Sequence, residues 1–319
     1  MQAFTSRVIR TGRQLQSRTT SHLPFKPPRN SSTMTISINE TAARATAFKA
    51  LHVPSKPLLL ANVYDALSAR TVASLPGCKA LATASFALAQ SIGKKDETLT
   101  LQDQLALVAP IAAVAAESKL PLTMDIQDGY AASGDYKKLA QVIQQFVTEF
   151  GAVGVNLEDS WHEKEGGEET IMEEEEAMNR VETVIKAAKE LGVDDFVVNA
   201  RSDTFLKGGK LEESIRRAKR YLEAGATTAF IFWPRSEEMK AESVQKVIDE
   251  LRGMANIGLR LGGPFTMSDL ARMGVARISV GPQLYLAVAG AGATSADEET
   301  ITAILTKKAN EVYGSSRWV

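Results

Sequence analysis

The stretch PLTMDIQDGYA, residues 121–131, contains the pattern that decides the fold of this chain. A short apolar run that suits a buried strand ends at Asp125, and Gln127, Asp128 and Gly129 follow at once. Polar side chains at the point where a buried strand opens into a glycine turn are typical of the loop end of a parallel sheet, where functional groups gather. The number of times that this pattern recurs along the chain therefore indicates the class of α/β fold.

The same kind of apolar run occurs eight times, and amphipathic helical patterns such as KLEESIRRAKRYLEAGA (210–226) lie between the runs. Several of these helical segments close on Gly, as helix C-termini prefer. Eight βα units without an interrupting linker, over roughly 250 residues, predict a (β/α)8 TIM barrel with extra helices at its C-terminus. The runs are residues 57–63, 79–85, 121–126, 152–158, 196–201, 228–233, 256–261 and 276–281.

The competing α/β fold is a doubly wound sheet, which would place a GxGxxG turn after its first strand. Here the first run is followed by VYDALSA (63–69), which does not fit that turn. We therefore expect a basic segment at 1–35, the barrel at 36–290, and a helical tail at 291–319 that could pack on a neighbouring subunit.

Composition excludes several classes of protein. The chain is 44% hydrophobic and 24% charged, as in ordinary soluble globular proteins. No apolar run approaches the ~18 residues of a membrane span. The single cysteine, Cys78, rules out an internal disulfide framework, and three scattered histidines do not predict a zinc site. Residues after 33 hold 31 basic against 38 acidic groups, which argues against nucleic-acid binding.

The first 33 residues hold six basic residues and no acidic one, and they are rich in Ser and Thr. This composition is typical of a mitochondrial transit peptide, and the alternative is a disordered basic tail with no address. We expect a mitochondrial location, with residues 1–33 dispensable for folding. Translation from Met34 would then give a cytoplasmic form.

Barrel enzymes place their active sites at the C-terminal ends of the strands. The side chains that these ends deliver are therefore the candidates for substrate binding, metal binding and catalysis. In chain order they are Tyr64 and Asp65, Ser85, Phe86 and Asp96, Asp125 and Gln127, Glu158, His162 and Lys164, and Arg201.

Carboxylates gather after neighbouring strands, without His or Cys. Adjacent strands lie about 4.8 Å apart, so Asp125 and Glu158 can reach one ion. Such a set suits a hard cation, Mg²⁺ or alternatively Mn²⁺. Arg201 would hold an anionic group of the substrate, and the amides around Ser85 and Phe86 would receive a carboxylate or enolate oxygen. Each acid alone could instead cap a helix, and Arg201 could be a buried ion-pair partner.

Six stretches together resemble the isocitrate lyase and phosphoenolpyruvate mutase superfamily, from about residue 40 to 290. The carboxyphosphonoenolpyruvate phosphonomutase-like branch is the most similar. The resemblance implies a Mg²⁺-dependent barrel that makes or breaks a C–C or P–C bond in a small 2-oxo or 2-hydroxy carboxylate, through an enolate-like species. The stretches are NVYDALSAR, TASFALAQSIGKKDE, MDIQDGY, GVNLEDS, VVNARSDTFL and MGVARISVGPQLY.

Carried over by position, the resemblance implies roles for individual residues. Asp125 would be the main carboxylate on the metal, and Asp96 and Glu158 would bind the ion largely through water. Arg201 and the amides near Ser85 and Phe86 would grip the substrate. The resemblance also implies a homo-oligomer, a dimer or tetramer, in which a C-terminal helix packs on a neighbour.

The chain departs from the superfamily at several positions. Gln127 stands where an acid is usual, although its carboxamide can still hydrogen-bond a metal-bound water. The loop EDSWHEKEGGEET (158–170) has neither the lyases' catalytic cysteine nor the mutases' Lys-Thr-Asn, and Arg235 replaces a lyase Glu. His162 and Lys164 are the loop residues left to supply a proton.

Two hypotheses follow. The first is a Mg²⁺-dependent lyase or mutase-type enzyme, with C–C cleavage favoured and a P–C phosphonomutase or hydrolase as the alternative. The second is a barrel that binds a carboxylate but has lost catalysis.

Overall fold

The computed structural model describes residues 37–161, 170–291 and 298–313, all within the unit Met34–Val319. Its main feature is one parallel sheet in the order β1-β11-β10-β9-β8-β5-β4-β3-β2. The strands of this sheet are β1 (Leu58–Leu60), β2 (Asn62–Val63), β3 (Leu81–Thr83), β4 (Leu122–Asp125), β5 (Ala152–Glu158), β8 (Val197–Ser202), β9 (Thr228–Ile231), β10 (Ala255–Gly258) and β11 (Arg277–Ser279).

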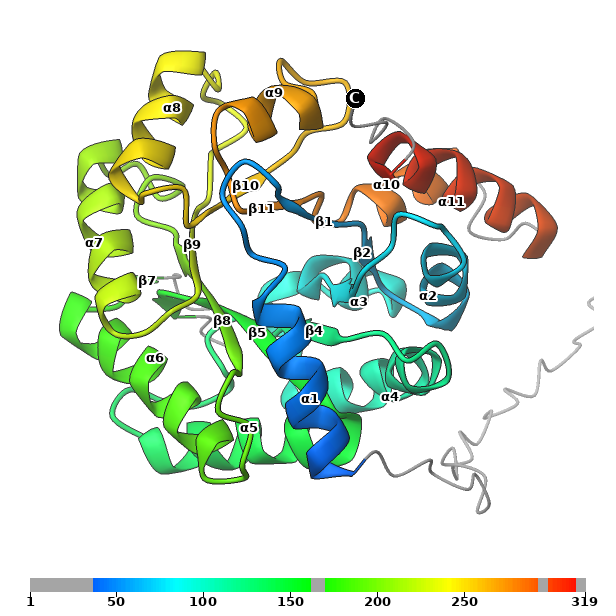
Figure 1. Ribbon diagram of the computed structural model, residues 1–319, viewed down its shortest axis with the longest axis horizontal. Helices are drawn as coiled ribbons and strands as arrows, with labels where there is room; N and C mark the ends of the chain where they lie inside the picture. The colour runs from blue at the N-terminus through cyan, green and yellow to red at the C-terminus, as the bar shows by residue number, and fades with distance from the viewer. Residues whose placement is uncertain (1–36, 162–169, 292–297, 314–319) are drawn as a thin grey trace, which may run out of the picture. The chain divides into compact units, whose positions relative to one another are not determined.

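The two ends of the sheet meet at Ala61. β1 pairs with β11, β2 pairs with β3, and Ala61 alone separates β1 from β2. They are therefore two halves of one strand, and the sheet curls into an eight-strand barrel surrounded by helices (Figure 1). The predicted (β/α)8 fold is confirmed, and each of the eight apolar runs overlaps one barrel strand, with β8 ending and β10 beginning one residue outside its run.

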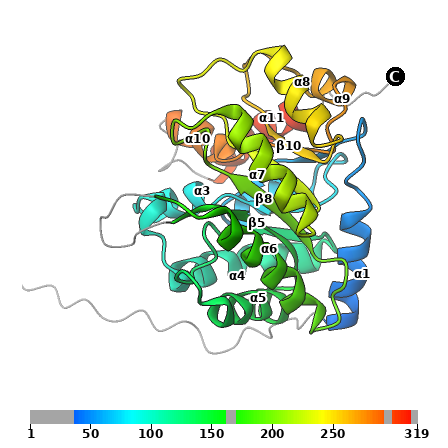
Figure 2. The same ribbon diagram turned by 90° about the vertical axis from the view of Figure 1, so that its left-hand side faces the viewer.

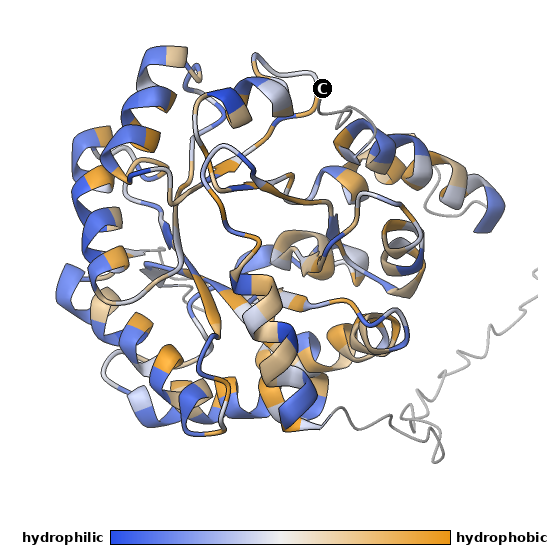
Figure 3. Cartoon of the chain, in the orientation of Figure 1, coloured by the Kyte–Doolittle hydropathy of each residue, from blue (hydrophilic) through white to orange (hydrophobic). Residues whose placement is uncertain are grey.

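Helices form where the sequence has amphipathic periodicity and caps. Capping boxes begin α2 and α4, and Gly151, at φ +63°, ends α5. Hydrophilic residues follow the outer sides of α6, α7 and α8 (Figure 3). The helices are α1 (Ile38–Lys49), α2 (Ala66–Ala73), α3 (Ser85–Ser91), α4 (Leu101–Glu117), α5 (Tyr136–Phe150), α6 (Glu174–Lys189), α7 (Leu211–Glu223), α8 (Ala241–Glu250), α9 (Met267–Arg272), α10 (Gln283–Gly290) and α11 (Glu298–Tyr313), with a 3-10 turn at Asp96–Thr98.

Helix α1 closes the N-terminal end of the barrel. Its buried Phe48 reaches the backbone of Gly154 on β5, where a Cβ atom would lie 3.3 Å from the Phe48 ring. In Figure 2, α1 lies on one side of the strands, and α3 and α10 lie on the other. Only the C-terminal end of the barrel is therefore left for a site that opens to solvent.

The described part of the C-terminal tail packs on its own barrel. Helix α11 lies beside α2 and α10 (Figure 1) and buries Leu305, Ala309 and Val312. The hydroxyl of Tyr313 accepts a hydrogen bond from the amide of Ala61 at 3.2 Å, at the junction of β1 and β2. Packing of this tail on a neighbouring subunit stays a prediction, as do the domain limits. Among the described helices, none combines the length and the apolar character that crossing a bilayer requires.

The buried side chain of His52 makes the stability of the barrel depend on pH. Its Nδ1 lies 3.0 Å from the carbonyl oxygen of Phe48, and the side chain is buried beneath the barrel. Burial, with a further contribution from the cation of Arg277, lowers the pKa of His52 to about 3. The folded protein therefore holds a neutral imidazole where the unfolded chain, with an ordinary pKa near 6.5, takes up a proton.

We expect stability to fall as the pH drops from 6.5 towards 3, because only the unfolded state binds this proton. Between pH 7 and pH 5 the loss from His52 should be about 2 kcal/mol. His52→Asn places an amide nitrogen at the same distance along the side chain but does not titrate. Urea unfolding at both pH values should therefore show a smaller pH-dependent loss in the variant. An equal loss in both proteins would contradict the assignment.

Candidate active site

The C-terminal end of the barrel opens into a cavity of about 760 Å³. It is lined by residues from every barrel strand and from the loops that follow them. Of the predicted site residues, Ser85, Phe86, Asp96, Asp125 and Arg201 line the cavity, whereas Tyr64, Asp65, Gln127 and Glu158 do not. His162 and Lys164 lie outside the described residues.

Asp125, the last residue of β4, is held rigidly at the cavity wall. Its Oδ1 accepts a hydrogen bond from Asn156 Nδ2, and its Oδ2 accepts one from the amide of Ser85, both at 2.8 Å. Its own amide donates to Thr83 Oγ1 at 2.9 Å, and its carbonyl accepts from Gln104 Nε2 at 2.8 Å. Each carboxylate oxygen keeps a lone pair after these bonds, so Asp125 can still bind a cation.

A relay of side chains sets the direction of the bond to Asp125. Thr228 Oγ1 donates to Asn199 Oδ1 at 2.7 Å, and Asn199 Nδ2 donates to Asn156 Oδ1 at 2.8 Å. The amide nitrogen of Asn156 must then face the Asp125 carboxylate. The sequence did not predict this relay. The signal that could have revealed it is one Asn within each of two apolar runs, 152–158 and 196–201.

Gln127 lies behind the site and not in it. Its side chain is fully buried, its φ of +52° lies in the left-handed region, and Nε2 donates to Asp96 at the carbonyl (2.7 Å) and at Oδ1 (2.9 Å). Gly129, at φ +77°, completes the turn. Gln127 therefore positions Asp96, and direct contact with an ion is left to residues that line the cavity.

Glu158 is turned towards Arg201. Its Oε1 accepts from Arg201 Nη1 at 2.5 Å, while Asp203 Oδ1 accepts from Arg201 Nε at 2.6 Å. The guanidinium also lies 4.1 Å from the ring centroid of Phe232. Burial would lower the pKa of Arg201, but Asp203, Glu158 and Asp125 more than offset this and raise it. Arg201 is thus an ion-pair partner that also lines the cavity.

The expected binding of one ion by Asp125, with Asp96 and Glu158 acting largely through water, stays a prediction. Within residues 37–161, 170–291 and 298–313, no three His, Cys, Asp or Glu side chains form a metal cluster. Glu158 pairs with Arg201 and Gln127 donates to Asp96, so water would have to join either acid to an ion at Asp125. The remaining set, Asp125 with Asp96 nearby, still fits Mg²⁺, which binds through one or two carboxylates and keeps several waters.

The roles of Ser85, Asp65 and Tyr64 in substrate binding stay predictions, and the structure gives each of them another contact. The amide of Ser85 donates to Asp125, and the amide of Phe86 follows it in the first turn of α3. Asp65 is the N-cap of α2, and its Oδ1 accepts from the amide of Ser68 at 2.7 Å. Tyr64 is buried edge-on against Tyr285, with centroids 5.1 Å apart, and burial raises its pKa.

A buried network ties the base of the loop after β5 to the site. Asp203, which pairs with the cavity arginine, accepts from Ser160 Oγ at 2.6 Å, and its amide donates to Asp159 Oδ1 at 2.7 Å. Asp159 Oδ2 accepts from Arg217 Nε at 2.9 Å, and Arg217 Nη2 donates to the Met172 carbonyl at 2.7 Å. Both flanks of residues 162–169, at β6 (Ser160–Trp161) and β7 (Thr170–Ile171), are thereby anchored.

Among the described residues that line the cavity, arginines outnumber acids. Two acidic residues, Asp96 and Asp125, are accompanied by four arginines. This excess favours an anionic ligand, and any cation bound at Asp125 would increase it. The arginines are Arg201, Arg235, Arg260 and Arg277.

Comparisons with known proteins agree with this geometry. The model of the phosphoenolpyruvate phosphomutase family matches residues 48–300. A chloroplastic carboxyvinyl-carboxyphosphonate phosphorylmutase of Arabidopsis thaliana is 32% identical over 209 residues, which are 63% of this chain and 58% of that protein. A 2-methylisocitrate lyase of Shewanella oneidensis is 28% identical over 194 residues, covering 60% of this chain and 63% of the lyase.

Solved structures share the fold. A Burkholderia cenocepacia J2315 protein, provisionally described as a phosphonomutase, superposes with a TM-score of 0.69 at 31% identity, covering 79% of this chain and 97% of that one. A phosphonopyruvate hydrolase solved with oxalate and Mg²⁺ has a TM-score of 0.66 at 22% identity, covering 78% and 84%.

The fold and the site thus define a barrel protein of the phosphoenolpyruvate mutase and isocitrate lyase superfamily, which contains lyases and mutases. The chain belongs to the phosphoenolpyruvate phosphomutase family within it.

Proposed function

We propose that this protein is a Mg²⁺-dependent lyase or mutase-type enzyme acting on a small 2-oxo or 2-hydroxy carboxylate through an enolate-like species, with C–C cleavage favoured. The observation that carries the proposal is the Asp125 carboxylate, fixed by Asn156 and the Ser85 amide on the wall of an arginine-lined cavity. Fixed groups that meet developing charge are the main source of rate enhancement in such sites.

In this proposal Asp125 holds the ion, Mg²⁺ or alternatively Mn²⁺, and Asp96 supports it through water. The ion would supply positive charge beside the substrate oxygens. Arg201 holds the substrate's anionic group, oriented by its bonds to Glu158 and Asp203. His162 and Lys164, in the segment that the structure does not describe, remain the candidates for proton transfer.

The alternative reaction is P–C bond chemistry, as a phosphonomutase or hydrolase. The four cavity arginines favour it as a specific observation, because a phosphonate carries more charge than one carboxylate. The chloroplastic phosphorylmutase and the phosphonopyruvate hydrolase among the similar proteins are consistent with it.

An activity panel tests the proposal. Oxaloacetate, 2-methylisocitrate, 2,3-dimethylmalate and phosphonopyruvate are each incubated with the full chain, with Mg²⁺ or with EDTA. We expect one of them to be consumed with Mg²⁺ only, and the product identifies the bond broken. Turnover that survives EDTA contradicts the mechanism. Mg²⁺-dependent ligand binding without consumption of any member favours the binding protein instead.

The assembly and location of the protein are further proposals. We propose a dimer or tetramer, which light scattering of the full chain tests. The composition of residues 1–33 supports delivery to mitochondria. A reporter fused to residues 1–33 that stays in the cytosol would refute delivery, and a chain started at Met34 that fails to fold would refute dispensability.

A further inference from the structure

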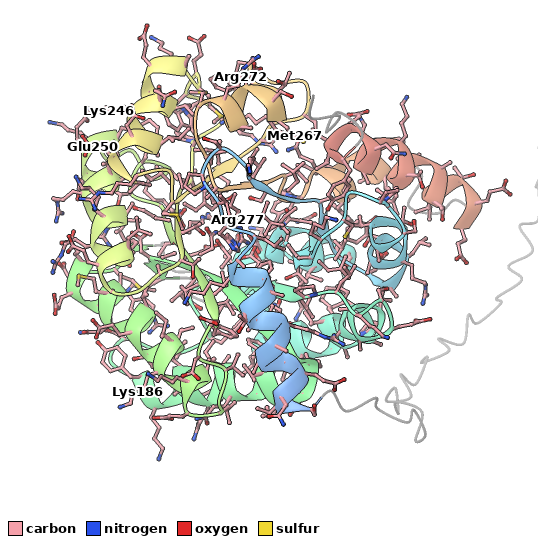
Figure 4. All side chains as sticks on the ribbon, in the orientation of Figure 1. Lys186, Lys246, Glu250, Met267, Arg272 and Arg277 are labelled. Carbon is pink, nitrogen blue, oxygen red and sulfur yellow. The ribbon has the colours of Figure 1, made fainter. Side chains whose placement is uncertain are left out.

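Arg277 is a buried arginine at the closed end of the cavity. It is the first residue of β11, it is 3% exposed, and it lines the cavity. Figure 4 labels it within the ring of strands, near the end of α1. Because Asp125 ends its strand whereas Arg277 begins one, the two side chains belong to opposite ends of the barrel interior.

Among the residues that the structure describes, the guanidinium of Arg277 has no partner. Its Nε and Nη1 are buried and make no hydrogen bond, and no ion pair joins it to any residue in the described part of the chain. The other buried arginines differ. Arg201 and Arg217 donate to carboxylates, and Arg180 donates to the carbonyl oxygen of Ala131 at 3.2 Å. An unpaired buried cation is costly and needs an explanation.

The surroundings leave the charge of Arg277 uncompensated. Burial lowers its pKa to about 9, and Asp125 is the group that acts in the opposite direction, so the side chain stays protonated at neutral pH. His52, which lies close enough for the two side chains to interact electrostatically, is neutral because its pKa is about 3. Thr123, which also lines the cavity, adds a second buried polar atom, Oγ1, without a partner.

We propose that Arg277 forms an anion subsite that binds a carboxylate at the closed end of the cavity, the end of the ligand far from Asp125. This rests on the proposed function and adds to it a residue that binds the second anionic group of the ligand. Nη2 also makes no hydrogen bond within the described residues, so the Nη1–Nη2 edge or the Nε–Nη2 edge of the guanidinium offers the two parallel donors that a carboxylate accepts. The carboxylate could belong to the substrate or to a separate small acid.

Titration calorimetry on the full chain with Mg²⁺ tests the subsite in the wild type and in Arg277→Met. The probes are oxalate, succinate, glutarate and acetate. We expect succinate or glutarate to lose about tenfold to a hundredfold in affinity, as loss of hydrogen bonds to a charged group implies. Oxalate, whose two carboxylates are bonded directly to each other, is expected to bind at the ion and should change less than about twofold.

Thermal unfolding separates this role from a structural one. Arg277→Met should leave the melting temperature of the ligand-free protein unchanged or higher, because an apolar side chain replaces an unpaired buried charge. Arg277→Met should also abolish the rise in melting temperature that the longer acid produces in the wild type. Arg277→Lys should keep part of that rise. Arg235→Met, at an exposed position on the cavity wall, is the matched control and should retain the distinction between oxalate and the longer acid.

The other possible results of calorimetry and thermal unfolding each support the subsite or overturn it. Acetate binding that Arg277→Met removes, with dicarboxylates unaffected, supports the subsite but assigns it to a separate small acid. Lower stability with unchanged affinity for every probe overturns the subsite and makes Arg277 structural. If wild-type oxalate binding needs no Mg²⁺, the proposed function fails, whereas an Arg277-dependent affinity for glutarate would still support the subsite.

Discussion

Asp125→Asn should abolish Mg²⁺ binding measured by titration calorimetry, and with it any Mg²⁺-dependent turnover. The variant keeps the size of the side chain but removes a carboxylate that two hydrogen bonds fix on the cavity wall. Loss of a group that only supports a metal ligand costs about 10- to 100-fold in affinity, so loss of the main ligand should exceed a hundredfold. Asp195→Asn, which alters an exposed carboxylate paired with Lys49, is the control and should bind normally. Unchanged affinity in Asp125→Asn would remove the metal assignment.

Gln127→Glu provides the complementary variant, because the structure places its side chain 2.9 Å from a carboxylate oxygen of Asp96. The new charge should destabilise the protein without the ion and keep or strengthen Mg²⁺ affinity, since the ion relieves the repulsion between the two carboxylates. A Mg²⁺ affinity that falls with this added charge would mean that Asp96 does not support the ion.

Arg201→Met should destabilise the fold by about 3–5 kcal/mol and remove oxalate binding, because it leaves two buried carboxylates without their partner. Glu158 and Asp203 are 3% and 1% exposed, and each accepts a hydrogen bond from the guanidinium. Urea unfolding measures the first effect and calorimetry the second.

The triple variant Arg201→Met, Glu158→Gln, Asp203→Asn distinguishes the two roles of Arg201. Removing both carboxylate charges should recover much of the stability, since no buried charge is then left unpaired, while oxalate binding stays absent. Recovery of oxalate binding in the triple variant would show that Arg201 is an ion-pair partner and not a substrate ligand.

The sequence predicts the positions of strands better than the directions of side chains. Asp65 and Asp125 both follow an apolar run and precede a helix, yet one caps α2 and the other faces the cavity. Likewise Glu158 ends its strand as expected, but its carboxylate turns to Arg201. Which way an acid points depends on donors from other strands, and a linear pattern does not contain them. Arg277 is the hardest side chain to predict. No sequence pattern indicates that its guanidinium is buried in the barrel without a hydrogen-bond partner among the described residues.

The relay from Thr228 to Asp125 has a consequence for engineering. Every bond in it runs in one direction, from a hydroxyl at the start of β9 to a carboxylate at the end of β4. A designer can therefore tune the basicity of the Asp125 carboxylate from a position three side chains away, without altering the residues that line the cavity. If Asp125 holds an ion as proposed, substitution at Thr228 would change its affinity for that ion while every residue in contact with the ligand stayed the same.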